Sequence, residues 1–160
     1  MKIGIITVSD SCFEGKREDK SGKTVQQMVA SLGRIVEYRI VPDEKKPLRL
    51  ALLDLIDKKQ VDLLLTTGGT GISPRDITPD VTEELIEKRI PGLGELMRMK
   101  TFSFSRTSVL SRAIAGVRGK TLVVNLPGSP RGAKECLGIL LPILSHAVDM
   151  IRGLPHDEQD

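Results

Sequence analysis

The chain has 160 residues, of which 39% are hydrophobic, 28% charged and 2% aromatic, and its formal net charge is +3. This length fits one domain that buries its own core. Four aromatic side chains are too few for a surface on which bases stack, and the charge excess forms no basic arm or stripe. Nucleic acid is therefore not expected as a partner.

The two cysteines, Cys12 and Cys136, are too few for a disulfide framework, and neither has a metal-ligand neighbour at the usual spacing. They indicate a reducing compartment. The first ten residues have the pattern of a strand rather than a signal peptide, and no apolar run is long enough to cross a bilayer. We therefore expect a cytoplasmic protein without a membrane partner.

Apolar patterning in the first half of the chain predicts strands that alternate with helices. Short apolar runs predict buried strands at 3–8, 35–41 and 61–67. Apolar residues at helical spacing predict helices over 25–32 and 48–56. The segment between the first strand and the first helix, 11–22, is polar and irregular.

The helix after the third strand carries signals at its start. Thr78 is expected to be the N-cap, with Pro79 at the first helical position. This helix should stop before Pro91, and a further helix should begin near Leu93.

Two β-rich runs, 111–117 and 120–126, flank a turn and predict a hairpin. A long apolar helix follows over 133–151, and Pro142 is expected to interrupt it. The remaining residues, 154–160, form a polar tail.

The alternation of strands and helices predicts an α/β fold. We expect three layers, α/β/α, with a mostly parallel central sheet and one antiparallel hairpin strand. Residues 1–153 are expected to form a single domain.

Ligands in such a fold bind outside the carboxyl ends of the strands. Four predicted strands end in loops rich in polar residues, glycine or proline, and parallel strands would bring these loops to one edge. Two aspartates in these loops, Asp43 and Asp76, are far apart in sequence and could face one pocket. The other candidate binding residues in these loops are Ser9, Asp10, Gly68, Gly69, Thr70, Gly71, Pro127, Gly128 and Ser129.

The most unusual stretch, residues 66–80, reads TTGGTGISPRDITPD. Its glycines let the backbone approach a ligand, and successive N–H groups there could form an anion-binding nest. The alternative is a turn that only requires positive φ angles. Two carboxylates beside a phosphate-sized nest indicate Mg²⁺, which prefers a few carboxylates with phosphate oxygens and water. Asp43 and Asp76 could also simply serve turns or caps.

Other residues give weaker signals. Gly22-Lys23-Thr24 resembles the end of a P-loop, but Arg17 stands where that motif requires glycine. Ser111, Arg112, Ser129 and Lys134 could contact a phosphate, or could serve turn chemistry and solvation. His146 has no neighbours that would make a Ser-His-Asp site.

Six motifs resemble the molybdenum-cofactor biosynthesis proteins of the MogA/MoaB family, which includes the G domain of gephyrin. They read VSDSCFEGKREDKSG, VPDE, TTGGTGISPRDITPD, IPGLGELMR, LSRAIAGV and NLPGSPRGAKECL. The resemblance extends from residue 3 to about 151, and TTGGTGISPRDITPD is its most specific motif.

The resemblance implies a molybdopterin adenylyltransferase, which transfers AMP from ATP to the terminal phosphate of molybdopterin and releases pyrophosphate. It implies that Asp43 and Asp76 are the critical aspartates and that Gly68–Gly71 form the substrate loop. It also implies a homotrimer, to which the segment 93–104 could contribute contacts.

The expected chemistry agrees with this activity. The attacking phosphate is already ionised at neutral pH, so catalysis requires positioning and charge neutralisation rather than a strong base. We expect Asp43 and Asp76 to hold Mg²⁺ against the ATP phosphates. The alternatives are a MoaB-like protein that binds molybdopterin or nucleotide without transfer, a trimeric scaffold module, and a P-loop NTPase.

Overall fold

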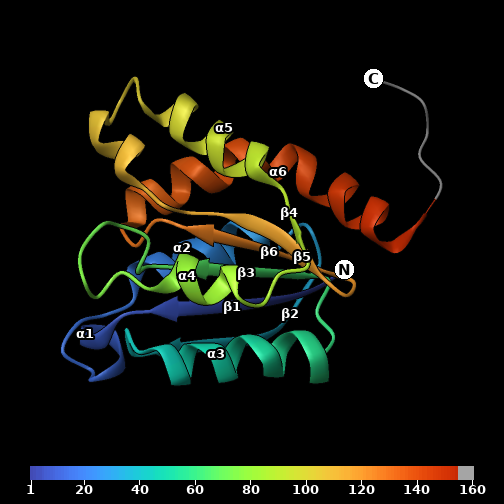
Figure 1. Ribbon diagram of the computed structural model, residues 1–160, viewed down its shortest axis with the longest axis horizontal. Coiled ribbons are helices and arrows are strands. Elements are labelled where there is room, and N and C mark those ends of the chain that lie inside the picture. The colour runs from blue at the N-terminus through green and yellow to red at the C-terminus, as the bar shows by residue number, and fades with distance from the viewer. Residues whose placement is uncertain (155–160) are drawn as a thin grey trace.

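The computed structural model describes residues 1–154, which fold around one six-stranded sheet (Figure 1). The strand order across the sheet is β2-β1-β3-β6-β5-β4. The strands are β1 (Lys2–Val8), β2 (Arg34–Val41), β3 (Leu63–Thr67), β4 (Lys88–Arg89), β5 (Ala115–Arg118) and β6 (Thr121–Leu126).

The sheet is mostly parallel. Strand β1 pairs in parallel with β2 and β3, and β3 pairs in parallel with β6. Strand β5 is antiparallel to both β6 and β4, so among the described strands it alone runs against the others. The predicted hairpin and the predicted mostly parallel sheet are therefore confirmed.

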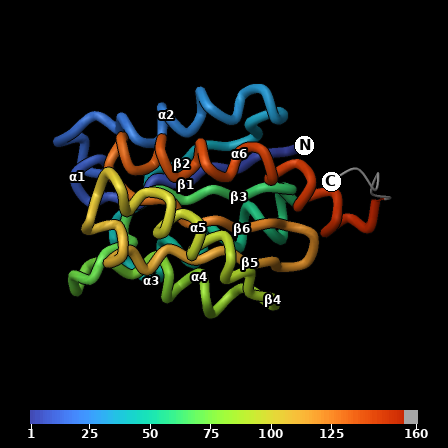
Figure 2. The backbone as a smooth tube through the Cα atoms, turned by 90° about the horizontal axis from the view of Figure 1, so that it is seen from above, coloured from blue at the N-terminus to red at the C-terminus, as the bar shows by residue number. Residues whose placement is uncertain are grey.

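Helices cover both faces of the sheet (Figures 1 and 2), which confirms the predicted three layers. Helices α2, α5 and α6 pack on one face, whereas α3 and α4 pack on the other. The helices are α1 (Asp10–Phe13), α2 (Lys20–Val29), α3 (Lys45–Leu53), α4 (Thr78–Glu83), α5 (Pro91–Thr101) and α6 (Pro130–Arg152), with a π-helical turn η1 (Asp54–Lys58) after α3 and a 3-10 helix η2 (Arg106–Leu110).

The strand residues alternate between two hydrophobic cores, because successive side chains of a strand point to opposite faces. Ile3 and Ile5 of β1 lie in the core beneath α2, α5 and α6. Ile6 and Val8 lie in the core beneath α3 and α4. Burial on both faces explains why the central strands read as continuous apolar runs.

Two predicted features of the helices are wrong. Helix α4 contains Thr78 and has Ile77 as its N-cap, because the Thr78 hydroxyl donates to the carbonyl of Gly68, 2.8 Å away. Helix α6 continues through Pro142 without a break, and the fully buried side chains of Leu140 and Leu144 anchor it on both sides of the proline.

The strand predicted over 111–117 is shorter than expected. Strand β5 begins only at Ala115, and the preceding residues follow η2 without strand pairing. The sequence pattern also missed α1 and β4, which have four and two residues. Elements this short show no measurable periodicity.

The carboxyl ends of β1, β2, β3 and β6 lie at one edge of the sheet, on the left of Figure 1, where α1 follows β1. Within the described residues, no helix combines the length and apolar character that a bilayer crossing requires. The predicted boundary between a domain at 1–153 and a tail stays a prediction, since most of 154–160 lies outside the described residues.

Candidate active site

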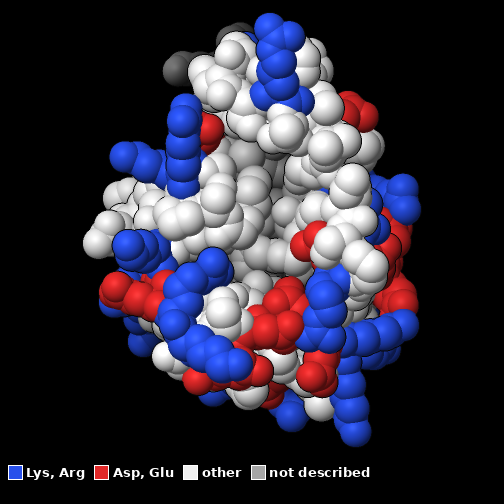
Figure 3. Space-filling view, turned by 90° about the vertical axis from the view of Figure 1, so that its left-hand side faces the viewer, with Lys and Arg blue, Asp and Glu red and all other residues white. Residues whose placement is uncertain are grey.

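The carboxyl edge of the sheet is hollowed between rims that carry charged side chains (Figure 3). Two cavities lie here and share one residue, Ser129. The first, which we call the aspartate cavity, has a volume of about 760 Å³ and is lined in part by Ser9, Asp43, Gly68, Gly69, Gly128 and Ser129. The second, the serine cavity, has a volume of about 360 Å³ and is lined in part by Thr70, Gly71, Arg98, Ser108, Ser111, Pro127 and Ser129.

Most predicted site residues therefore lie at the two cavities. Asp10 and Asp76 lie beside them and contact residues of their walls. Lys134 is exposed and is not among the described residues that line either cavity.

Asp43 follows β2 and is held to the loop after β1 by two reciprocal hydrogen bonds. The N–H of Asp10 donates to Asp43 Oδ2 at 2.8 Å, and the N–H of Asp43 donates to Asp10 Oδ1 at 2.9 Å. Burial raises the pKa of Asp43, and the charges of Asp10 and Asp76 add to this rise against the opposing hydrogen bond from Asp10.

Asp76 is held within its own loop. The N–H of Ser73 donates to Asp76 Oδ2 at 2.9 Å. Burial alone would raise the pKa of Asp76, but hydrogen bonds from the hydroxyl and N–H of Ser73 and from the N–H of Gly71 hold it below its usual value. Asp76 is therefore ionised at neutral pH.

The glycine loop between β3 and α4 brings the two aspartates together. Gly68 and Gly69 have φ angles of +103° and +63°, and a β-carbon on Gly68 would lie 2.2 Å from the carbonyl oxygen of Val8. A β-carbon on Gly69 would lie 3.3 Å from Asp43 Oδ1, and one on Gly71 would lie 2.8 Å from Asp76 Oδ2. Both carboxylates thus lie against the same short stretch of backbone, although of the two only Asp43 lines a cavity.

Arg112 fixes the loop that carries Asp76. Its Nε donates to the carbonyl of Gly71 at 2.8 Å, and its Nη2 donates to the carbonyl of Asp76. Both terminal nitrogens pair with the Asp80 carboxylate at 2.9 Å, and the N–H of Arg112 donates to the carbonyl of Thr70 at 2.8 Å. Its guanidinium thus binds protein acceptors.

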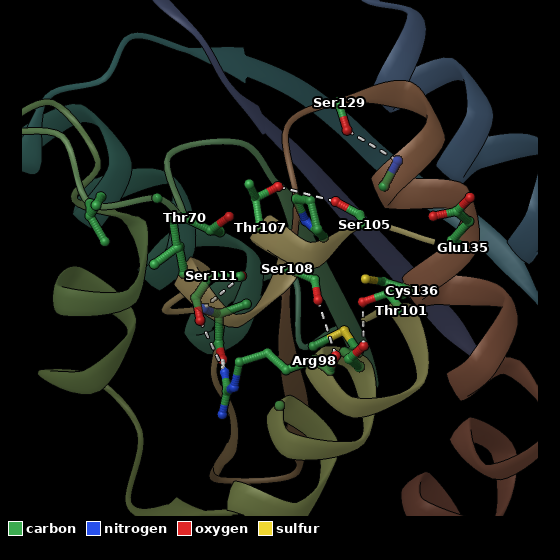
Figure 4. A pocket seen from close by; sticks show the side chains of 18 residues that line it. Thr70, Arg98, Thr101, Ser105, Thr107, Ser108, Ser111, Ser129, Glu135 and Cys136 are labelled. Atoms are coloured by element: carbon green, nitrogen blue, oxygen red, sulfur yellow. Dashed lines mark hydrogen bonds between the residues drawn. The ribbon is translucent and has the colours of Figure 1, made fainter. Parts of the chain in front are cut away.

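The serine cavity is walled by α5, η2 and the start of α6 (Figure 4). Arg98 of α5 points toward Ser111, and its Nη1 donates to the carbonyls of Ser111 and Ala113 at 3.2 and 3.0 Å. Ser129 caps α6 by accepting the N–H of Gly132 at 3.1 Å. The contacts of Arg98 escaped the sequence analysis, since no local pattern links it to its acceptors. Arg112, a candidate phosphate contact in the sequence, instead binds acceptors within the protein.

The two aspartates suit a metal that also binds phosphate. Each carboxylate accepts a backbone N–H at Oδ2, and Oδ1 of Asp43 lies beside the glycine loop. Within residues 1–154, no group of three or more His, Cys, Asp or Glu side chains could form a full protein cage. Mg²⁺ fits this donor set, because it commonly takes one or two carboxylates together with phosphate oxygens and water.

Comparison with known proteins finds relatives that match most of the chain. A family model described as a probable molybdopterin binding domain matches residues 4–146. A molybdopterin adenylyltransferase from Helicobacter pylori is 44% identical over 94% of this chain and 88% of its own length. The Escherichia coli protein of the same name is 36% identical over 86% of this chain and 72% of its own. The crystal structure of the molybdopterin biosynthesis enzyme MoaB from Thermus thermophilus matches with a TM-score of 0.91 and 43% identity, covering 98% of this chain and 99% of that one.

Proposed function

Since this chain belongs to the family of molybdopterin-binding proteins that contains the molybdopterin adenylyltransferases, we propose that it transfers AMP from ATP to the terminal phosphate of molybdopterin. Pyrophosphate is the other product. The predicted family and enzyme class are confirmed by these relatives. The observation that carries the reaction is the convergence of Asp43 and Asp76 on one glycine loop, beside two cavities that share Ser129.

Two cavities that meet suit a reaction between two substrates. The nucleophile is a phosphate that is ionised at neutral pH, so the protein does not have to remove a proton. It has to bring two anions together, which requires orientation and compensation of their charge. The shared wall at Ser129, next to the first turn of α6, supports a position there for the reacting phosphates.

In this proposal the carboxylates of Asp43 and Asp76 would hold Mg²⁺. The metal, when bound, supplies positive charge to the phosphates of ATP and to the departing pyrophosphate. The glycine loop offers backbone N–H groups to a phosphate. Ser9, Asp10, Ser111 and Lys134 remain proposed substrate contacts, and for Lys134 the role would require a substrate that reaches beyond the serine cavity.

A homotrimer forms part of the proposal. Segment 93–104 contributes Leu93 and Met97 to the core, but other apolar side chains on α5 and beyond face outward. This apolar patch consists of Met99, Phe102, Phe104, Val109 and Leu110, each at least 44% exposed. An apolar patch of this kind favours contact with a second copy of the chain. We place the enzyme in the cytoplasm, where its two free cysteines would stay reduced.

The test is pyrophosphate release by the purified protein with Mg²⁺, ATP and molybdopterin, with adenylylated molybdopterin identified by mass spectrometry. Release should require both substrates, and Asp76→Asn should lower it by about 100-fold or more. A MoaB-like protein without transferase activity would bind molybdopterin and release no pyrophosphate. Equal turnover by Asp76→Asn would remove Asp76 from the mechanism.

A further inference from the structure

We propose that Arg75 is a ligand for the polyphosphate of ATP, and that it exchanges its ion pair with Asp10 for the phosphates when ATP binds. This inference rests on the proposed function, because it names a further residue of the same nucleotide site. Arg75 lies in the loop between the glycine stretch and α4, one residue before Asp76.

Arg75 is linked to Asp43 through the carboxylate of Asp10. Its Nη2 contacts Asp10 Oδ2 at 2.5 Å, while Asp10 Oδ1 accepts the N–H of Asp43 at 2.9 Å. The charge of Arg75 also acts on Asp43 and favours its ionised form. The guanidinium thus lies at the rim of the aspartate cavity, within reach of the carboxylates proposed to hold the metal.

The charge balance of this rim requires a cation. Three carboxylates, Asp10, Asp43 and Asp76, lie together here, and the polyphosphate of ATP adds further negative charge. Arg112 is the other arginine of the loop, but its guanidinium binds Gly71, Asp76 and Asp80 within the protein. Removing it from these acceptors would release the loop that carries Asp76.

Arg75 can change partners at little cost. Its ion pair is exposed at the surface, with 59% of the Arg75 side chain and 39% of the Asp10 side chain accessible. Exposed ion pairs contribute little to stability. Arg75 contacts Asp10 through one nitrogen, whereas an arginine can bind a phosphate through two parallel, charge-assisted hydrogen bonds. Asp10 would keep its hydrogen bonds with Asp43 after the exchange.

Arg17 is the competing candidate. It lines the aspartate cavity, and its Nη2 lies 3.5 Å from the hydroxyl of Ser9, a neutral partner. Arg75 lines neither cavity, but it is paired with Asp10, which is hydrogen-bonded to Asp43, and its charge acts on Asp43. The experiment therefore includes both arginines.

The experiment measures the affinity of the full chain for Mg-ATP, Mg-pyrophosphate and AMP by calorimetry. Arg75→Ala should weaken ATP and pyrophosphate binding by roughly 10- to 100-fold and AMP binding much less, as expected for lost charge-assisted hydrogen bonds. Arg75→Lys should recover part of the loss. The matched control is Arg89→Ala. Arg89 is another exposed arginine, which lies on β4 and pairs with Glu83 at 2.5 Å. This variant should bind all three ligands like the wild type.

Wild-type ATP affinity in Arg75→Ala, or loss of affinity only in Arg17→Ala, would overturn the assignment of Arg75 and leave the proposed function intact. The protein could also bind pyrophosphate in a manner that depends on Arg75 yet release no pyrophosphate from ATP and molybdopterin. That result would support the assignment of Arg75 and overturn the proposed function.

Discussion

Asp43 and Asp76 carry the same chemical group in different surroundings. Burial next to two other carboxylates raises the pKa of Asp43, whereas hydrogen bonds from Ser73 and Gly71 overcome burial and lower the pKa of Asp76. The ionised form of Asp43 therefore destabilises the folded chain, and the ionised form of Asp76 stabilises it. A cation bound beside Asp43 would stabilise its ionised form and so remove this loss of stability, as expected for a metal ligand.

The two aspartates should consequently respond in opposite directions to loss of charge. A raised pKa in the folded state means that stability is lost as the pH rises through the titration of Asp43. Asp43→Asn should thus raise Tm without ligand, increasingly from pH 4 to pH 7, by about 2–4 °C for each kcal/mol regained. It should also lower pyrophosphate release by about 100-fold.

Asp76→Asn is the matched control for this experiment. A lowered pKa contributes stability above the usual titration range, and this stability is lost as the pH falls. Asp76→Asn should therefore lower Tm at pH 7 and approach the wild type in acid. Thermal unfolding from pH 4 to pH 8 measures both effects, and a decrease in Tm for both variants at pH 7 would contradict the difference argued for Asp43.

The loop that joins β3 to α4 carries Asp76. It contains no regular structure between the glycines and Thr78, yet it has to hold Asp76 in place. Arg112 does this from the segment before β5, by binding the carbonyls of Gly71 and Asp76 and the carboxylate of Asp80. The planar guanidinium matches these acceptors, and an ammonium group cannot bridge them in the same way.

Arg112→Gln should therefore lower pyrophosphate release by about 10- to 100-fold through misplacement of Asp76, and Arg112→Lys should restore little of it. The matched control is Arg118→Gln. Arg118 pairs with Asp57 through two nitrogens and donates to the carbonyl of Leu85, away from the cavities. Both variants should lose stability of order 1 kcal/mol, but Arg118→Gln should keep its turnover. Similar loss of turnover in both would show that Arg112 acts only through stability.

The sequence predicts the elements that have a strong pattern of their own. Strands β1, β3 and β6 read as apolar runs because they are buried on both faces, whereas β4 consists of two exposed residues and has no such pattern. Strand direction predicts that Asp43 and the glycine loop meet at one edge of the sheet, whereas the position of Asp76 also depends on Arg112. The contact of Arg75 with Asp10 spans 65 positions, and that of Arg112 with Gly71 spans 41. Only the folded chain defines such contacts.

At the scale of the whole molecule, the apolar patch lies next to the serine cavity. A shallow groove on the patch is lined by Met99, Phe102 and Val109 together with Arg98. Arg98 also lines the serine cavity, where it binds the carbonyls of Ser111 and Ala113. A second copy of the chain seated on the patch would therefore hold one wall of the serine cavity in place.

Charged substitutions in the patch should test this assembly. Light scattering after gel filtration should give three times the mass of the chain for the wild type. Met99→Asp and Phe102→Asp should give the mass of one chain at micromolar concentration, because burying an unpaired carboxylate in an interface costs several kcal/mol. The matched control is Leu50→Asp. Leu50 is 57% exposed on α3, which covers the opposite face of the sheet, so this variant should remain a trimer.

The dissociated variants should also separate assembly from chemistry. Their Asp43, Asp76 and Arg112 are unchanged, so affinity for Mg-ATP should stay near that of the wild type. The KM for molybdopterin should rise, since Arg98 would lose the support of the neighbouring copy and the wall of the serine cavity would loosen. A monomeric wild type, or dissociated variants with an unchanged KM for molybdopterin, would contradict a link between the patch and the cavity. A rise in KM together with intact ATP binding would assign molybdopterin to the serine cavity and ATP to the aspartate cavity.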